Sequence, residues 1–339
     1  MEHRYSRQVL FKPIGEAGQT RLSKASVAII GCGALGTAAA EMIVRAGIGT
    51  LHIADRDVVE YSNLQRQQLF TEADAAGMMP KVHAARNRLM EIRSDIELYT
   101  YFEHVDEALM EDLAGQTDLI IDATDNFETR LLINDAAHKY AIPWIYGACV
   151  GGAGTVFAFA PGESACFRCL LPILPVMNET CDTAGIIAPA VQMTASCQCA
   201  EALKWLTGNR ETMRKKMYNF DLWHSEQLEV GITRIRNENC ETCGNHPTFP
   251  SLIKHEQMKY AVLCGRDAVQ ILADHGRSLS LDDAEQLAGR LGSRCKRTPY
   301  FVEFYAEGYR MVLFNTGRLI IHGLRDVNTG RSLYHKLFG

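Results

Sequence analysis

Three glycines in the segment VAIIGCGALGTAAA, residues 27–40, have the spacing of a phosphate-binding turn. Gly31, Gly33 and Gly36 follow an apolar run and precede an alanine-rich stretch, which is the order of strand, turn and helix that a GxGxxG motif requires. Glycines let the backbone approach a phosphate, and the N–H groups of a helix N-terminus bind it. Asp55 ends the next apolar run, where its carboxylate is placed for a ribose hydroxyl. These residues predict a nucleotide site, with NAD as the first candidate.

Polar and cationic residues follow this carboxylate in the stretch DRDVVEYSNLQRQQLF and at the start of the next predicted helix. They are Asn63, Arg66, Gln67 and Lys81. A lysine in the first turn of a helix opposes the helix dipole at a cost of roughly a few tenths of a kcal/mol, so the placement favours a function for this charge. Lys81 and Arg66 suit a phosphate chain longer than one group. The alternative is that both are ordinary surface charges.

Two carboxylates occur in the segment DLIIDATDNFETR, directly after another predicted buried strand. Asp122 and Asp125 lie at the carboxyl end of that strand, where ligands bind in open α/β sheets. Beside a triphosphate, such carboxylates indicate Mg²⁺, which takes oxygen ligands from protein and phosphate. One of the pair is expected only to cap the loop, and we assign the magnesium to Asp125.

Four of the 11 cysteines form two CxxC pairs about 70 residues apart. Cys166 and Cys169 make the first pair, and Cys240 and Cys243 make the second. Two such pairs favour a structural, tetrahedral Zn²⁺ over a redox pair or chance. The remaining cysteines, apart from Cys181, are interpreted as core or incidental residues: Cys32, Cys149, Cys197, Cys199, Cys264 and Cys295.

Composition limits the class of protein that must position these residues. The 339 residues are 47% apolar, which is enough for one large α/β domain and a smaller one. The charged N-terminal stretch and the lack of a long apolar run predict a cytoplasmic protein without a membrane segment. An odd number of scattered cysteines argues against a disulfide framework. A net charge of −5 without a basic run argues against nucleic acid as a partner.

Strands and helices are expected to alternate through the first half of the chain, as in a doubly wound, Rossmann-like, mostly parallel sheet. The strand-like segment TVFAFAPG then predicts an antiparallel extension, and a long helix follows near 188–206. A linker is expected at 245–250, between a nucleotide-binding domain at 1–247 and a small α+β domain at 252–339. In the second domain, residues 302–323 alternate apolar and polar types as in an antiparallel meander. The expected strands are 26–31, 51–55, 96–102, 118–123 and 143–150, and the expected helices are 37–46, 80–92, one near 109, 130–140 and 331–337.

The ordered set of motifs is similar to that of one known family. It resembles the MoeB/ThiF/HesA family of sulfur-carrier adenylyltransferases, bacterial relatives of ubiquitin-activating enzymes, over residues 1 to about 247. The resemblance implies a homodimer that uses ATP and Mg²⁺ to adenylate the C-terminal glycine of a ubiquitin-like carrier ending in Gly-Gly. Sulfur would then be delivered to the activated carrier. The motifs are RYSRQ at 4–8, GCGALG at 31–36, Asp55, SNLQRQ at 62–67, PK at 80–81, DATDN at 122–126, the two CxxC pairs and TCDTAG at 180–185.

The resemblance also implies roles for single residues. Arg7 would reach across the dimer into the partner's site, and Cys181 would lie on a loop that in some members becomes linked to the carrier. A thiol without a role in adenylation is the alternative for Cys181, because that step needs no thiolate. The residues implied to contact the nucleotide and its metal are Gly31, Gly33, Gly36, Asp55, Asn63, Arg66, Gln67, Lys81, Asp122, Asp125 and Asn126.

Two other functions remain open from the sequence. An NAD-dependent oxidoreductase would explain only the glycine motif and Asp55, and a zinc-stabilised scaffold would need no catalysis. Within the favoured function, a ThiS-type carrier would mean thiamine synthesis and a MoaD-type carrier molybdopterin synthesis. The CDTAG segment slightly favours ThiS. No rhodanese-like loop is recognisable after residue 252, so we expect a separate sulfur-donor protein.

Overall fold

The computed structural model describes residues 3–173, 184–253, 260–262, 267–272 and 279–338. The chain divides into two compact units, Met1–Ile253 and Lys254–Gly339. Among the described residues, no helix combines the length and apolar character needed to cross a membrane. Cys181 and Cys264 lie outside the described residues.

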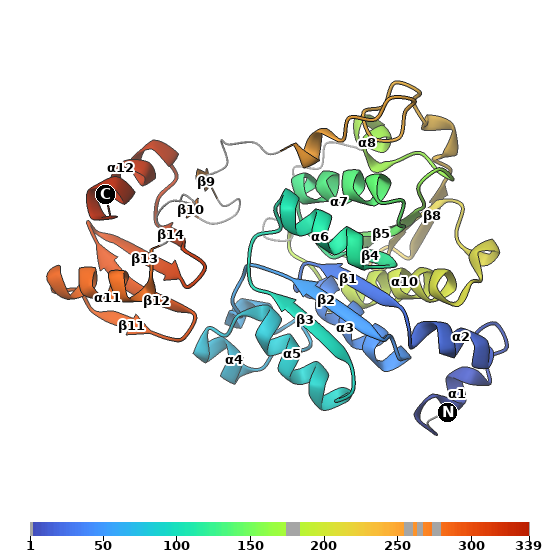
Figure 1. The fold of residues 1–339 in the computed structure, drawn as a ribbon, viewed down its shortest axis with the longest axis horizontal. Helices are drawn as coiled ribbons and strands as arrows, with labels where there is room; N and C mark the ends of the chain where they lie inside the picture. The colour runs from blue at the N-terminus through green and yellow to red at the C-terminus, as the bar shows by residue number, and fades with distance from the viewer. Residues whose placement is uncertain (1–2, 174–183, 254–259, 263–266, 273–278, 339) are drawn as a thin grey trace. The chain divides into compact units, whose positions relative to one another are not determined.

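The first unit is built on an eight-stranded sheet in the order β3-β2-β1-β4-β5-β6-β7-β8 (Figure 1). The first five strands of that order are parallel, and β5 to β8 pair antiparallel, which confirms the expected parallel sheet with an antiparallel extension. The strands are β1 (Ser26–Ile30), β2 (Thr50–Ala54), β3 (Glu97–Tyr101), β4 (Leu119–Asp122), β5 (Trp144–Val150), β6 (Ala153–Phe159), β7 (Met217–Asp221) and β8 (Glu226–Val230).

Helices cover both faces of this sheet, with α6 and α7 on one side and α3, α5 and α10 on the other (Figure 1). Strand β1 shows why two cores form: Val27 and Ile29 enter one, and Ala28 and Ile30 enter the other, because side chains alternate along a strand. The helices are α1 (Ser6–Val9), α2 (Gly15–Leu22), α3 (Ala34–Ala46), α4 (Glu72–Gly77), α5 (Lys81–Ile92), α6 (Glu107–Gln116), α7 (Phe127–Lys139), α8 (Phe167–Leu170) and α10 (Ala188–Thr207).

The second unit contains a six-stranded antiparallel sheet in the order β11-β12-β13-β14-β10-β9. The expected meander at 302–323 corresponds to β12, β13 and β14. Helix α11 contributes Ala284 and Ala288 to the core of this unit. Its elements are β9 (Tyr260–Val262), β10 (Ala268–Leu272), α11 (Leu281–Arg290), β11 (Cys295–Arg297), β12 (Phe301–Ala306), β13 (Tyr309–Phe314), β14 (Arg318–His322) and α12 (Val327–Phe338).

Candidate active site

The glycine turn joins β1 to α3 at the carboxyl edge of the parallel strands. Gly31 has a φ of +97°, and a Cβ built on it would lie 2.6 Å from the carbonyl oxygen of Ala123. A Cβ on Gly36 would lie 2.0 Å from the Gly31 carbonyl oxygen. Gly33 precedes the first helical residue, and the nearest atom to a Cβ there is Gln67 Nε2 at 3.8 Å. Two glycines therefore permit close packing, and the third leaves room over the N-terminus of α3, whose first N–H groups have no partner within the helix.

Asp55 is held above this turn by two backbone donors. The Cys32 N–H donates to Asp55 Oδ2 at 2.7 Å, and the Asp57 N–H donates to Oδ1 at 2.7 Å. Burial raises the pKa of the Asp55 carboxyl, and the nearby Lys81 ammonium acts in the opposite direction. Because each carboxylate oxygen has a second lone pair, this arrangement fits acceptance of a ribose hydroxyl.

Lys81 is a buried cation at the first position of α5. Its side chain is 6% exposed, and its Nζ lies 3.4 Å from Asp57 Oδ2. It is therefore not an ordinary surface charge. Arg66 is partly exposed and donates from Nη1 to the Ser62 carbonyl oxygen at 2.9 Å. Of the two cations expected at the phosphates, one has been desolvated by folding and the other lies at the surface.

Two amides from the SNLQRQ segment are buried. Asn63 Oδ1 accepts a hydrogen bond from the Glu60 N–H at 3.0 Å, which fixes the short helical turn around it. Gln67 is 4% exposed, and among the described residues its Oε1 finds no hydrogen-bond partner. A buried amide oxygen costs free energy when it lacks a partner. Its position beside Gly33 fits a polar ligand at the turn.

Asp122 and Asp125 lie in different environments. Asp122 is fully buried and accepts from Arg130 Nε at 3.2 Å and from Thr124 N and Oγ1 at 2.9 and 2.6 Å. Arg130 also donates to the Thr124 carbonyl oxygen at 2.7 Å. Asp122 thus shapes the loop after β4, as the sequence allowed for one of the pair, and its contact with a nucleotide stays a prediction. Asp125 is exposed, so a metal ion bound to a nucleotide could reach its carboxylate.

The remaining predicted residues are spread over three segments. Asn126 caps α7 by accepting from the Thr129 N–H at 2.9 Å, and its Nδ2 lies 3.5 Å from Asp125 Oδ1. Arg7 is exposed on α1 and makes no hydrogen bond or ion pair with the described part of the chain. Since Cys181 is outside the described residues, its role also stays a prediction.

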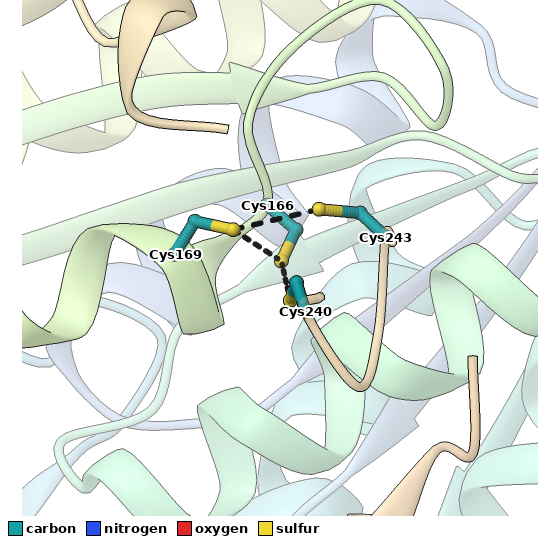
Figure 2. A group of neighbouring side chains, drawn as sticks. All are labelled: Cys166, Cys169, Cys240 and Cys243. Atoms are coloured by element: carbon teal, nitrogen blue, oxygen red, sulfur yellow. Dashed lines mark hydrogen bonds between the residues drawn. The ribbon is translucent and has the colours of Figure 1, made fainter. Parts of the chain in front are cut away.

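The four cysteines of the two CxxC pairs form one cluster (Figure 2). Their sulfur atoms all lie within 4.8 Å of one another, with 3.6 Å between Cys166 and Cys240 and 3.5 Å between Cys169 and Cys243. Tetrahedral zinc with Zn–S bonds of about 2.3 Å needs sulfurs about 3.8 Å apart. Burial raises the pKa of Cys169 to about 11 in the absence of a metal. The donor set and its spacing fit Zn²⁺.

Residues inside the first CxxC pair anchor this cluster to α7. Arg168 Nη2 lies 2.8 Å from Asp135 Oδ2 and 2.8 Å from Ser251 Oγ. The Phe167 N–H donates to Asn134 Oδ1 at 2.8 Å. Sequence reasoning missed this network, although a charged residue between two metal-type cysteines was a visible signal. The helix that begins beside Asp125 is therefore tied to the cysteine cluster near its other end.

An open α/β sheet with a glycine turn at a helix N-terminus defines a nucleotide-binding protein, and the sequence profile of the ThiF family matches residues 5–242. The chain belongs to the ThiF family, as its motifs predicted. It is 48% identical over 342 residues to the sulfur carrier protein ThiS adenylyltransferase of Bacillus subtilis (strain 168), covering 100% of both chains. It is 35% identical over 243 residues to the molybdopterin-synthase adenylyltransferase of Escherichia coli (strain K12), covering 71% of this chain and 96% of that one.

A structural likeness supports the same fold. The crystal structure of E. coli MccB with MccA-N7isoASN matches with a TM-score of 0.63 and 21% identity. The match covers 72% of this chain and 76% of MccB. At this identity the likeness concerns the fold alone.

Proposed function

We propose that this protein uses ATP to adenylate the C-terminal glycine of a ThiS-type sulfur carrier protein and releases pyrophosphate. The observation that carries the proposal is the 48% identity to a ThiS adenylyltransferase over the full length of both chains. The identity to the molybdopterin-synthase adenylyltransferase is lower, at 35%. Thiamine synthesis is therefore favoured over molybdopterin synthesis.

The chemistry of adenylation suits the side chains at the carboxyl edge. A C-terminal carboxylate has a pKa near 3.5 and is ionised at neutral pH, so the nucleophile needs no general base. The barrier comes from negative charge on the α-phosphate and on the departing pyrophosphate. The N-terminus of α3, Lys81 and Arg66 oppose that charge, and Asp55 orients the ribose. Asp125 would hold Mg²⁺, which when bound neutralises phosphate oxygens.

Exchange of labelled pyrophosphate into ATP tests the proposal. The exchange is expected with a ThiS-type carrier, to be weaker with a MoaD-type carrier, and to be absent when the carrier lacks its terminal Gly-Gly. Exchange with the MoaD-type carrier alone would reassign the substrate. No exchange with either carrier, together with tight NAD binding, would favour an oxidoreductase, and no nucleotide binding at all would favour a scaffold.

The cysteine cluster is proposed to hold a structural Zn²⁺ through Cys166, Cys169, Cys240 and Cys243. When bound, the ion would cross-link α8 to the turn at 240–243. Metal analysis is expected to find about one zinc per chain. Cys240→Ser should lose most of the zinc and unfold at lower temperature, whereas Cys295→Ser, which changes an exposed cysteine of the second unit, should alter neither. A Cys240→Ser protein with full zinc and stability would refute the assignment.

A homodimer and a separate sulfur donor complete the proposal. Arg7 is exposed on α1 and would enter the partner's site, so each site needs residues of two chains. Arg7→Ala and Lys81→Ala should each be inactive alone. Mixed subunits should regain about a quarter of the wild-type exchange, because half of the dimers are mixed and each has one intact site. No recovery after verified subunit mixing would argue against the shared site.

A further inference from the structure

Asp57 connects two residues of the nucleotide site through its main chain. Its N–H donates to Asp55 Oδ1 at 2.7 Å, and its carbonyl oxygen accepts from the Lys81 N–H at 2.9 Å. A β-bridge between Val58 and Pro80 continues this contact by one residue. The loop after β2 is therefore paired with the start of α5. Its backbone fixes Asp57 between the carboxylate assigned to the ribose and the ammonium assigned to the phosphates.

The carboxylate of Asp57 lies beside the ammonium group of Lys81. Asp57 Oδ2 lies 3.4 Å from Lys81 Nζ, and the two side chains are 33% and 6% exposed. An ammonium removed from water is stabilised by nearby negative charge, which Asp57 supplies here together with the Asp55 carboxyl. The contact is longer than the roughly 2.7–2.9 Å of a tight charge-assisted bond. The contact therefore directs the Lys81 side chain, and phosphate oxygens can form shorter bonds with its N–H groups than Asp57 does.

We propose that Asp57 is a positioning residue that holds the Lys81 ammonium toward the phosphates of ATP. The inference rests on the proposed function, because it takes ATP as the nucleotide. Asp57 acts through Lys81 and not on the nucleotide itself. Its loss should therefore weaken binding of the phosphate chain and leave binding of the nucleoside intact.

Calorimetric titration of the full chain with Mg·ATP, without carrier, tests this inference. Asp57→Asn keeps the shape and the backbone contacts, and should raise the Kd for Mg·ATP about fivefold, the scale of one disturbed charge-assisted contact. The Kd for adenosine should stay within about twofold, and Asp57→Glu should recover part of the ATP affinity. Asp118→Asn, which removes one carboxylate at the amino end of β4, is the matched control and should bind Mg·ATP like the wild type.

A double-mutant cycle separates positioning from a structural role. In a Lys81→Ala background, Asp57→Asn should have no further effect on the Kd for Mg·ATP. Thermal melting verifies that the variants are folded, and Asp57→Ser, which also lacks the charge, replaces the asparagine variant if that one does not fold. An unchanged or lower Kd for Mg·ATP, an equal loss for adenosine, or additive effects in the cycle would each overturn the inference. A wild-type protein that does not bind Mg·ATP would instead refute the proposed function.

Discussion

Asp122 and Asp125 show how three positions along the chain separate a structural carboxylate from an accessible one. The first ends a buried strand, and Arg130 and Thr124 occupy its oxygens. The second has left the strand and is exposed. The two aspartates of the motif DATDN are therefore expected to respond differently to substitution.

Replacing each aspartate by alanine should separate stability from activity. Asp122→Ala leaves the Arg130 guanidinium buried without its carboxylate and should lower the free energy of unfolding by about 3–5 kcal/mol. Asp125→Ala should change it by less than about 0.5 kcal/mol and still abolish pyrophosphate exchange. Urea unfolding and the exchange assay measure the two effects. Wild-type exchange in Asp125→Ala would exclude its role as magnesium ligand.

The three glycines between β1 and α3 differ in how closely other atoms surround them. Gly31 and Gly36 are required by close backbone contacts, one at Ala123 and the other within the turn itself. Gly33 has space above it and a negative φ of −85°. Packing therefore explains two of the glycines, and the open space at the third suits the phosphate of the proposed nucleotide.

Alanine at Gly36 or Gly33 should give opposite phenotypes. Gly36→Ala forces α3 away from the turn and should destabilise the protein by about 1–3 kcal/mol. Gly33→Ala should melt near the wild-type temperature but bind Mg·ATP at least about tenfold more weakly, a loss of about 1.4 kcal/mol, because the methyl group occupies the phosphate position. Calorimetric melting and titration distinguish the two variants. Equal melting temperatures for both would contradict this explanation.

Helix α7 carries a partly buried histidine, His138, that makes stability depend on pH. Burial lowers the pKa of His138 to about 4, although nearby Asp135 acts in the opposite direction. The unfolded chain, with a histidine pKa near 6.5, binds more protons than the folded chain below that pH. The contribution of His138 is therefore complete above about pH 6.5 and is lost as the pH falls toward 4.

Between pH 7.5 and 5.5, His138 should cost the wild type about 1 kcal/mol of unfolding free energy. Over the same pH interval, the free energy of unfolding of a His138→Gln variant should fall by about 1 kcal/mol less than that of the wild type. Urea unfolding of both proteins at the two pH values gives the comparison, which cancels the titration of other groups. Parallel losses in the two proteins would show that His138 does not titrate as described.

The elements that the sequence predicted well are those with strong local signals. Runs of Val, Ile and Leu predicted the inner strands. Helices α3 and α7 begin three residues before the expected Thr37 and Arg130. Their N-cap residues, Gly33 and Asn126, set the earlier starts. Strand β8 was not predicted, because all its residues are exposed and its side chains do not alternate between buried and exposed positions. The role proposed for Asp57 was not predicted from the sequence either, since it depends on contact with a residue 24 positions away.

The whole molecule consists of two units with separate cores. The described residues assigned to the nucleotide and all four clustered cysteines belong to the first unit. The molybdopterin-synthase adenylyltransferase matches 71% of this chain with 96% of its own length. The described residues to which the proposed chemistry is assigned therefore all lie in the first unit.

A protein consisting of residues 1–253 should therefore fold and exchange pyrophosphate within about threefold of the full chain, a difference of less than about 1 kcal/mol. Exchange rates at saturating ATP and carrier, together with zinc content, provide the measurement. A folded 1–253 protein that binds Mg·ATP but shows no exchange would assign carrier recognition to the second unit.

The cysteine cluster joins positions 74 residues apart, Cys166 and Cys240, and so closes a long loop of chain that includes α10. The entropy of closing such a loop grows only with the logarithm of its length, by about 0.6 kcal/mol for each doubling. Residues added in the exposed turn at 222–225, between β7 and β8, should therefore cost little, whereas α10 and β7 pack into the cores of the first unit and cannot change length freely. Insertions are thus expected to be tolerated in that exposed turn, whereas the tightly packed segments around Gly31, Asp57 and Lys81 should allow almost none.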